Sequence, residues 1–150
     1  MTAAELESYL REHIPLSQAM DVSVQSVQLD RVVLAAPLQP NINHRETAFG
    51  GSISALAILA AWSLLHTRLQ HEGLVARLVI QRNTMEYEQP VLGEFSATAS
   101  LDADAPWKRF IHMLKTKGKA RIAVSSSLEH AGFVVGKFSG EFVALAGHDT

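Results

Sequence analysis

Cysteine is absent from this sequence of 150 residues. Its absence excludes disulfide bonds, zinc sites built from thiolates and a cysteine nucleophile. It also fits a reducing compartment, and we expect a cytoplasmic location. Charged residues are sparse as well, at 19% of the chain with a net charge of -2. That balance disfavours nucleic acids and charged membrane surfaces as partners.

Long apolar runs and targeting signals are also missing. The longest apolar stretch, residues 53–65, is interrupted by Ser54 and Ser63. It is shorter than the roughly 20 residues that a membrane span requires. The N-terminus lacks the basic start and apolar run of a signal peptide. We therefore expect no membrane partner, and we interpret the apolar stretch as part of a buried helix.

The composition that is present suits one folded domain. Hydrophobic residues make up 47% of the chain, which is enough for a sizeable core at this length. We expect a single domain over residues 1–150, opening with an amphipathic helix within residues 1–18. Apolar residues recur there at intervals of four from Leu6 to Ile14, and Pro15 follows.

The longest predicted helix covers residues 52–70. Apolar side chains fill all of its faces, as is typical of a helix buried in a core. A loop precedes it over residues 39–51, where asparagines, a proline and a Gly-Gly pair gather. Gly73 is the residue type that commonly ends a helix.

The other segments are predicted mainly as strands. Residues 22–38 favour one strand or a hairpin-like pair, and residues 106–115 have the spacing of a short helix. Four further strands are expected, with the clearest alternation of apolar and polar residues in the second, over residues 75–88, 94–101, 119–128 and 133–145. This order favours an α+β fold in which an antiparallel sheet wraps around one long central helix.

The junction between the loop and the long helix is the most informative stretch. It runs from Asn43 to Ser52 as Asn-His-Arg-Glu-Thr-Ala-Phe-Gly-Gly-Ser. This string resembles the active-site junction of hotdog-fold thioesterases, in which an asparagine precedes a His-Gly-Gly step that opens the central helix. Asn43 lies seven residues before Gly50, as that pattern expects, and Phe49 takes the place of the usual histidine.

Two other segments agree with the resemblance. Residues 87–94 look like the Tyr-x-x-Pro…Gly-Asp/Glu bend between two hotdog strands, and residues 117–132 resemble the final hairpin. The likeness covers about residues 20–145. It is strongest to a bacterial family of hotdog-fold thioesterase domains that occurs alone or C-terminal to a GNAT acetyltransferase domain.

The resemblance implies a function and an assembly. It implies hydrolysis of a thioester of coenzyme A or of an acyl-carrier protein, with no cofactor beyond the coenzyme A of the substrate. It also implies a homodimer, or a dimer of dimers that makes a homotetramer, because hotdog domains usually pair edge to edge. Their thioester sites then lie between subunits.

The residues at the junction suit this chemistry. Backbone N–H groups at a helix start can stabilise the oxyanion that forms when water attacks a thioester, since they lack partners and lie at the positive end of the dipole. Gly50 and Gly51 let a ligand approach closely, although they could equally serve only a tight turn. Asn43 could orient a water or the carbonyl, or bond its own backbone. Phe49 and Ser52 are expected beside the substrate, with Ser52 also as the N-cap.

The general base is the point of departure from the family pattern. Related enzymes often carry a carboxylate eight residues after the first glycine, where this chain has Ile58. Glu46 and Gln89 are the remaining candidates for positioning water. The loss of the carboxylate also leaves open a non-catalytic module that binds or senses acyl-CoA. A hydratase or dehydratase that uses His44 with Glu46 is a third possibility.

A short basic cluster could bind the rest of the substrate. Lys117, Lys119 and Arg121 lie within five residues of one another. They could meet the phosphates of coenzyme A as point charges, or they could simply be solvated at the entrance of a strand. The histidines show no spacing typical of metal ligands, so no metal site is expected.

Overall fold

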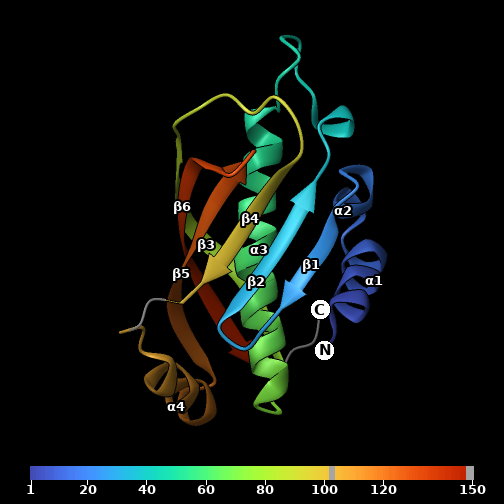
Figure 1. The fold of residues 1–150 in the computed structure, drawn as a ribbon. Coiled ribbons are helices and arrows are strands. Elements are labelled where there is room, and N and C mark those ends of the chain that lie inside the picture. The colour runs from blue at the N-terminus through green and yellow to red at the C-terminus, as the bar shows by residue number, and fades with distance from the viewer. Residues whose placement is uncertain (102–103, 148–150) are drawn as a thin grey trace.

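Antiparallel strands curve around one long helix in the computed structural model, which describes residues 1–101 and 104–147 (Figure 1). Over that part of the chain, six strands form one sheet in the order β1-β2-β4-β5-β6-β3. The helices are α1 (Ala3–His13), α2 (Pro15–Ala19), the 3-10 helix η1 (Gln39–Asn41), α3 (Gly50–His71) and α4 (Trp107–Lys117). The strands are β1 (Ser23–Val27), β2 (Arg31–Ala36), β3 (Ala76–Tyr87), β4 (Phe95–Ser100), β5 (Lys119–His130) and β6 (Phe133–Ala146). The predicted α+β hotdog architecture is confirmed.

The core lies between the concave face of the sheet and α3. Strand β4 shows why the chain folds this way, since Phe95, Ala97 and Ala99 are buried while the polar residues between them stay half-buried. Alternation of period two sends one set of side chains to the helix and the other to the opposite face. The Ser126 hydroxyl on β5 donates a 3.0 Å hydrogen bond to the Ala57 carbonyl, which ties the sheet to the middle of α3.

Helix α3 is longer than predicted and is largely enclosed. It has 22 residues, and apolar side chains on most of its faces are buried. Its length and hydropathy would by themselves allow a membrane span, but 56% of its most apolar window is buried inside the protein. That position is typical of the central helix of a wrapped sheet.

Two helix boundaries differ from the prediction. Helix α3 begins at Gly50, and its N-cap is Phe49 rather than Ser52. The extended backbone of Phe49 turns the chain into the helix, and its carbonyl accepts the amides of Ser52 (2.9 Å) and Ile53 (3.1 Å). The N-terminal region forms two helices rather than one, because Pro15 starts α2 at the position where a missing N–H costs nothing.

The other elements agree closely with the sequence. Residues 22–38 form the pair β1 and β2, and the inserted helix appears as α4, capped by left-handed Gly118. Gly73 has a φ of 72° just after α3, as expected for the residue beyond a helix end. Ala131 and Gly132 both have positive φ and form the two-residue turn between β5 and β6.

Strand β3 forms one edge of the sheet. It pairs with β6 only, over almost its full length, and most of its side chains are exposed. It starts beside the end of α3 and runs back along the helix to Tyr87, near the helix start (Figure 1). Its final residues therefore reach the segment that resembled an active site.

Candidate functional site

The loop before α3 is held in place by a buried asparagine. Asn41 is 2% exposed, and its side chain donates to the carbonyls of Met20 (3.0 Å) and Pro37 (2.8 Å). Its own carbonyl accepts the Phe49 amide at 2.7 Å. These bonds anchor both ends of the loop, so the position of the α3 start depends on Asn41.

Asn43 closes the same loop at its tip. Its Oδ1 accepts the amides of Arg45 (2.8 Å) and Thr47 (3.2 Å), and its Nδ2 donates to the Thr47 hydroxyl at 2.9 Å. The side chain is therefore engaged by its own loop, in the manner of an asparagine turn. Its role toward water or a thioester remains a prediction.

The two charged candidates of the loop point to solvent. His44 and Glu46 are both exposed, and Glu46 has a left-handed φ of 64° in the turn. Neither lines the pocket that borders the start of α3. The structure thus separates Glu46 and His44 from the Gly-Gly pair that the sequence placed near them.

Gly50 and Gly51 open α3 with two unused donors. The helix has no side-chain cap, and within the described residues neither glycine amide has a hydrogen-bond partner. A Cβ on Gly51 would lie 2.3 Å from a ring carbon of Phe49, whose side chain is 57% exposed and lies across it. A Cβ on Gly50 would meet Tyr87 at 3.5 Å, an ordinary contact. A side chain at position 51 would therefore displace the Phe49 ring, whereas one at position 50 would not displace Tyr87.

A pocket of about 310 Å³ borders this helix start. It is lined by Ala48, Gly50, Ile53, Tyr87, Glu88, Gln89, Pro90 and Val91. The structure thus brings Gln89 to the same pocket as Gly50 of its own chain, and its role in positioning water stays a prediction. The Ala48 amide donates to the Val91 carbonyl (2.9 Å), and the amides of Glu88 and Gln89 donate to the Val135 carbonyl (2.9 and 3.1 Å). These bonds tie the bend after β3 to the loop before α3 and to β6.

Two residues of this pocket were not predicted as site residues. The Tyr87 hydroxyl donates to the Gly50 carbonyl at 3.1 Å, and Glu88 places a carboxylate in the same pocket. The signal for both was the Tyr-x-x-Pro bend in the sequence. It located the segment, but strand spacing alone does not show which end of the helix the segment meets.

Comparison with known proteins supports the resemblance. The model of the family described as "Putative thioesterase (yiiD_Cterm)" matches residues 3–146. The chain belongs to this family.

Solved structures show the same fold over nearly the whole chain. A protein of unknown function from Chlorobaculum tepidum TLS has a TM-score of 0.90 at 29% identity, covering 96% of this chain and 94% of that one. A protein from Shewanella oneidensis, described as a "putative thioesterase", has a TM-score of 0.83 at 23% identity, with 95% and 96% covered. A Pseudomonas aeruginosa protein, described as a "Probable Thioesterase", has a TM-score of 0.80 at 22% identity, with 95% of each chain covered.

This member of the thioesterase family has no carboxylate at the usual helix position. Ile58 is half-buried on α3 and packs against the core. The carboxylate that does line the pocket beside Gly50 is that of Glu88, from the bend after β3. Within the described residues of one chain, Glu88 is thus the carboxylate that lines the pocket at the helix start.

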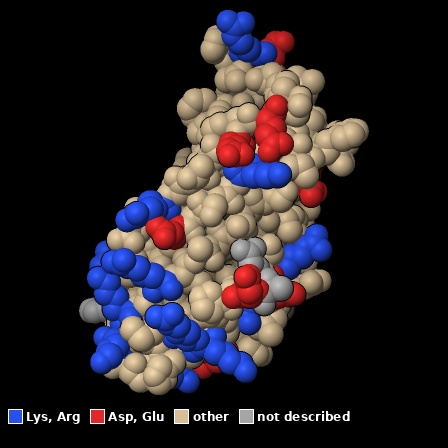
Figure 2. Space-filling view, turned by 90° about the vertical axis from the view of Figure 1, so that its left-hand side faces the viewer, with Lys and Arg blue, Asp and Glu red and all other residues tan. Residues whose placement is uncertain are grey.

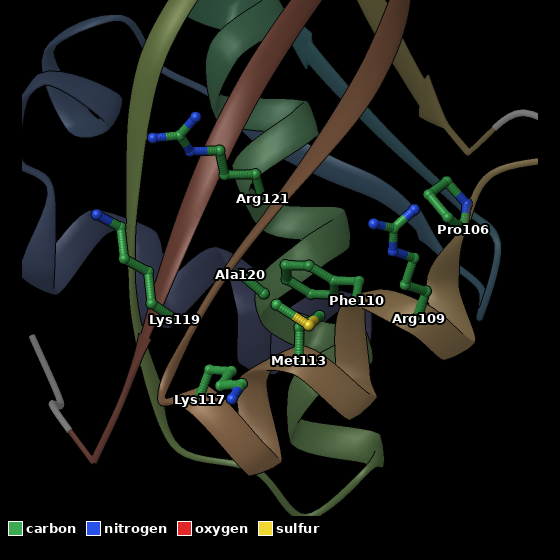
Figure 3. A pocket seen from close by; sticks show the side chains of 8 residues that line it. All are labelled: Pro106, Arg109, Phe110, Met113, Lys117, Lys119, Ala120 and Arg121. Atoms are coloured by element: carbon green, nitrogen blue, oxygen red, sulfur yellow. The ribbon is translucent and has the colours of Figure 1, made fainter.

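The predicted basic cluster lies elsewhere on the molecule. Lys117, Lys119 and Arg121 line a groove of about 540 Å³ between α4 and β5, together with Arg109 from the start of α4 (Figure 3). The groove is at the end of the molecule where α3 ends (Figure 1). Because α3 has 22 residues, its two ends lie roughly 33 Å apart. The basic residues therefore do lie together, but their groove does not border the start of α3 in the same chain.

Proposed function

We propose that this thioesterase family member hydrolyses an acyl thioester of coenzyme A or of a carrier protein in the pocket beside Gly50. The observation that carries the proposal is the pair of unpartnered amides at the start of a long buried helix. Such amides are fixed donors at the positive end of the helix dipole, and they need no reorganisation when charge develops on an oxygen.

The residues that line this pocket can support hydrolysis of a thioester by water. The thioester carbonyl oxygen accepts hydrogen bonds from the Gly50 and Gly51 amides. A water, positioned by Gln89 and giving a proton to the Glu88 carboxylate, forms a bond from its oxygen to the carbonyl carbon. The carbon–sulfur bond then breaks, and the sulfur leaves as a thiol with the proton returned by Glu88. The products are a carboxylic acid and a free thiol.

The experiment is release of free thiol from acyl-CoA substrates of increasing chain length, followed with a chromogenic thiol reagent. The chain has no cysteine, so the protein contributes no background signal. Replacing Glu88 by Gln should lower kcat about 100-fold, the size of a lost general base. Glu86→Gln is the matched control, because Glu86 is exposed near the end of β3, two residues before Glu88, but does not line the pocket. Equal activity of the two variants would remove Glu88 from the mechanism.

A second candidate is a module that binds an acyl thioester without hydrolysing it. The half-buried Ile58, where related enzymes carry a carboxylate, favours this reading. It requires that acyl-CoA raises the melting temperature while no thiol appears. Release of thiol by wild-type protein, lost in the Glu88 variant, would exclude it.

The free edge of β3 supports self-association. A long edge strand presents unpaired N–H and C=O groups to another strand, and β3 carries exposed apolar residues along its length, among them Val79 and Tyr87. Antiparallel pairing of two copies of β3 would extend the sheet across a two-fold axis. It would also bring the Tyr87 end of one copy to the Ala76 end of the other.

A further inference from the structure

The tip of the β5–β6 hairpin contacts the bend that follows β3. The imidazole Nδ1 of His130, the last residue of β5, lies 2.7 Å from the backbone carbonyl oxygen of Glu94. Glu94 is the last residue of the bend, directly before β4 begins at Phe95. The pairing of β4 with β5 ends at Ser96 and Glu129. The side chain of His130 therefore extends the connection between these strands into the bend.

This contact fixes the position of the imidazole proton. A carbonyl oxygen can only accept a hydrogen bond, so Nδ1 of His130 has to carry the hydrogen. The neutral ring is then the tautomer with a proton on Nδ1 and a lone pair on Nε2. The protonated ring also donates from Nδ1, so the bond to Glu94 can form in both charge states.

Few other interactions hold the end of the bend. Outside the sheet ladders, no backbone–backbone hydrogen bond among the described residues involves positions 92–94. Leu92 is 65% exposed, and the side chain of Glu94 is exposed as well. An exposed segment with few backbone hydrogen bonds opens easily. The hydrogen bond from His130 restrains the segment at the point where it enters β4.

The hairpin itself does not require this imidazole. Its turn consists of Ala131 and Gly132, which both have positive φ, and the backbone of β5 pairs with β6 as far as His130. The ring of His130 lies against the bend instead, because a Cβ on Gly93 would be 3.0 Å from its Cε1. Gly93 has no positive φ, so the space taken by the ring accounts for glycine at this position better than backbone conformation does.

Electrostatic repulsion opposes this junction. Glu94 of the bend and Glu129 of β5 line one hollow together with His130, and no Lys or Arg belongs to that lining. Figure 2 shows the Lys and Arg side chains gathered toward the opposite end of the molecule, where α3 ends. Like charges repel, so the carboxylates favour separation of the bend from the hairpin. The hydrogen bond from His130 offsets that repulsion.

The other end of the bend carries residues of the pocket at the helix start. Glu88 and Gln89 line this pocket, and their amides donate to the Val135 carbonyl on β6. The Val91 carbonyl accepts the Ala48 amide from the loop before α3. The bend is thus held at its start, in its middle and, through His130, at its end. Local opening involves contiguous segments, so loss of the last bond loosens the whole bend.

We propose that His130 is a positioning residue, which keeps Glu88 and Gln89 in the geometry that thioester hydrolysis requires. The inference rests on the proposed function and deepens it, because His130 does not line the pocket and acts on it through the bend. Displacement of a reacting group by roughly 1 Å can lower a rate by about 100-fold. A tether that contacts no substrate can therefore control turnover.

Two substitutions separate the donor from the ring. His130→Asn keeps an N–H donor on Cγ, where Nδ1 was, but loses the ring, whereas His130→Phe keeps a ring and loses the donor. In His130→Phe, kcat for thiol release should fall about tenfold with KM unchanged, as for a defect in the chemical step. In His130→Asn, kcat should stay within about twofold of wild type. Equal losses in the two variants would assign the effect to packing of the ring and overturn the proposal.

A cap at the far end of the sequence controls for lost stability. Thr2→Ala removes the hydroxyl that accepts the Glu5 amide at 3.1 Å at the start of α1. Its cost to stability is comparable to that of one lost hydrogen bond, and it should leave kcat unchanged. A fall in kcat as large as that of His130→Phe would assign both effects to general destabilisation and overturn the proposal.

Two further measurements need no turnover. Long-range proton–nitrogen NMR of the neutral imidazoles should show His130 with its proton on Nδ1, and a proton on Nε2 would overturn the proposal. Hydrogen exchange at the amides of Glu88 and Gln89 should become about tenfold faster in His130→Phe, but not in His130→Asn or Thr2→Ala. Unchanged exchange in His130→Phe would also overturn it. Absence of thiol release from wild type would refute the proposed hydrolysis alone, so the two failures are distinguishable.

Discussion

The Tyr87 hydroxyl at the end of β3 donates a 3.1 Å hydrogen bond to the carbonyl of Gly50, the first residue of α3. This contact spans 37 positions of sequence and joins the edge strand to the helix start. It orients the turn that carries the free amides of Gly50 and Gly51. Because Tyr87 is 54% exposed, the bond is better placed to position the site than to stabilise the fold.

Replacing Tyr87 by Phe should therefore affect turnover more than stability. The free energy of unfolding should fall by about 1 kcal/mol or less, the net value of one hydrogen bond. The kcat for thiol release should fall severalfold, since the first turn of α3 is less restrained. Tyr9→Phe is the control, because Tyr9 is the other tyrosine of the chain and lies on α1. An equal loss of activity in both variants would argue against a specific role for Tyr87.

The two glycines should differ in their tolerance of alanine. Gly50→Ala keeps the amide and meets Tyr87 at an ordinary distance, so stability and thiol release should stay near wild type. Gly51→Ala must displace the Phe49 ring. The ring is exposed and can swing away, so stability should change by less than about 1 kcal/mol, while kcat falls as the ring enters the site. Thermal unfolding and thiol release measure the two effects.

A double variant checks the cause of that difference. In a Phe49→Ala background, Gly51→Ala should no longer lower activity further, because the ring that it displaces is gone. Two independent losses that simply add would contradict the contact between Phe49 and Gly51 as the reason for glycine.

Two substitutions of Asn43 distinguish a role in closing the loop from a direct contact with substrate or water. Asn43→Asp keeps the oxygen that accepts the amides of Arg45 and Thr47 but loses the donor to the Thr47 hydroxyl. If loop closure is the role, turnover should be largely kept in Asn43→Asp. It should fall about tenfold in Asn43→Ala, which corresponds to about 1.4 kcal/mol and lies within the range of one lost hydrogen bond. An equally inactive Asp variant would show that the side-chain amide itself contacts the substrate or water.

The proposed pairing of β3 predicts a charge-sensitive dimer. Val79 is 39% exposed on β3, and a lysine on an edge strand opposes strand addition. Wild-type protein should sediment at twice the chain mass of 16.4 kDa, and Val79→Lys should shift it toward the monomer. Val134→Lys, at a similarly exposed position on β6, should leave the mass unchanged. A monomeric wild type would refute the pairing.

Local pattern was enough to predict most elements of this fold. Alternation over residues 94–101 became β4, and the spacing of Trp107, Phe110 and Leu114 became the buried face of α4. The predictions that were wrong concerned the ends of helices. Helix α3 starts at Gly50 because the Phe49 backbone caps it, and serine at position 52 was mistaken for the cap on residue type alone.

The sequence by itself determined the junction between the loop and the long helix and the family of the protein. The Asn43 to Ser52 string, the absence of cysteine and the apolar central helix all follow from residue order, because helix starts and strand alternation depend on neighbours in the chain. The string also marked the family to which the chain belongs. The loss of the carboxylate at Ile58 could be seen without a structure.

Only the tertiary structure decided which residues meet. Glu88 and Tyr87 reach Gly50, while Glu46, close in sequence, points to solvent. Lys117, Lys119 and Arg121 line a groove together with Arg109, at the end of the molecule where α3 ends. The physical reason is that strand order and sheet curvature depend on the packing of the whole core around α3, and no local spacing encodes which strand end lies against which helix end.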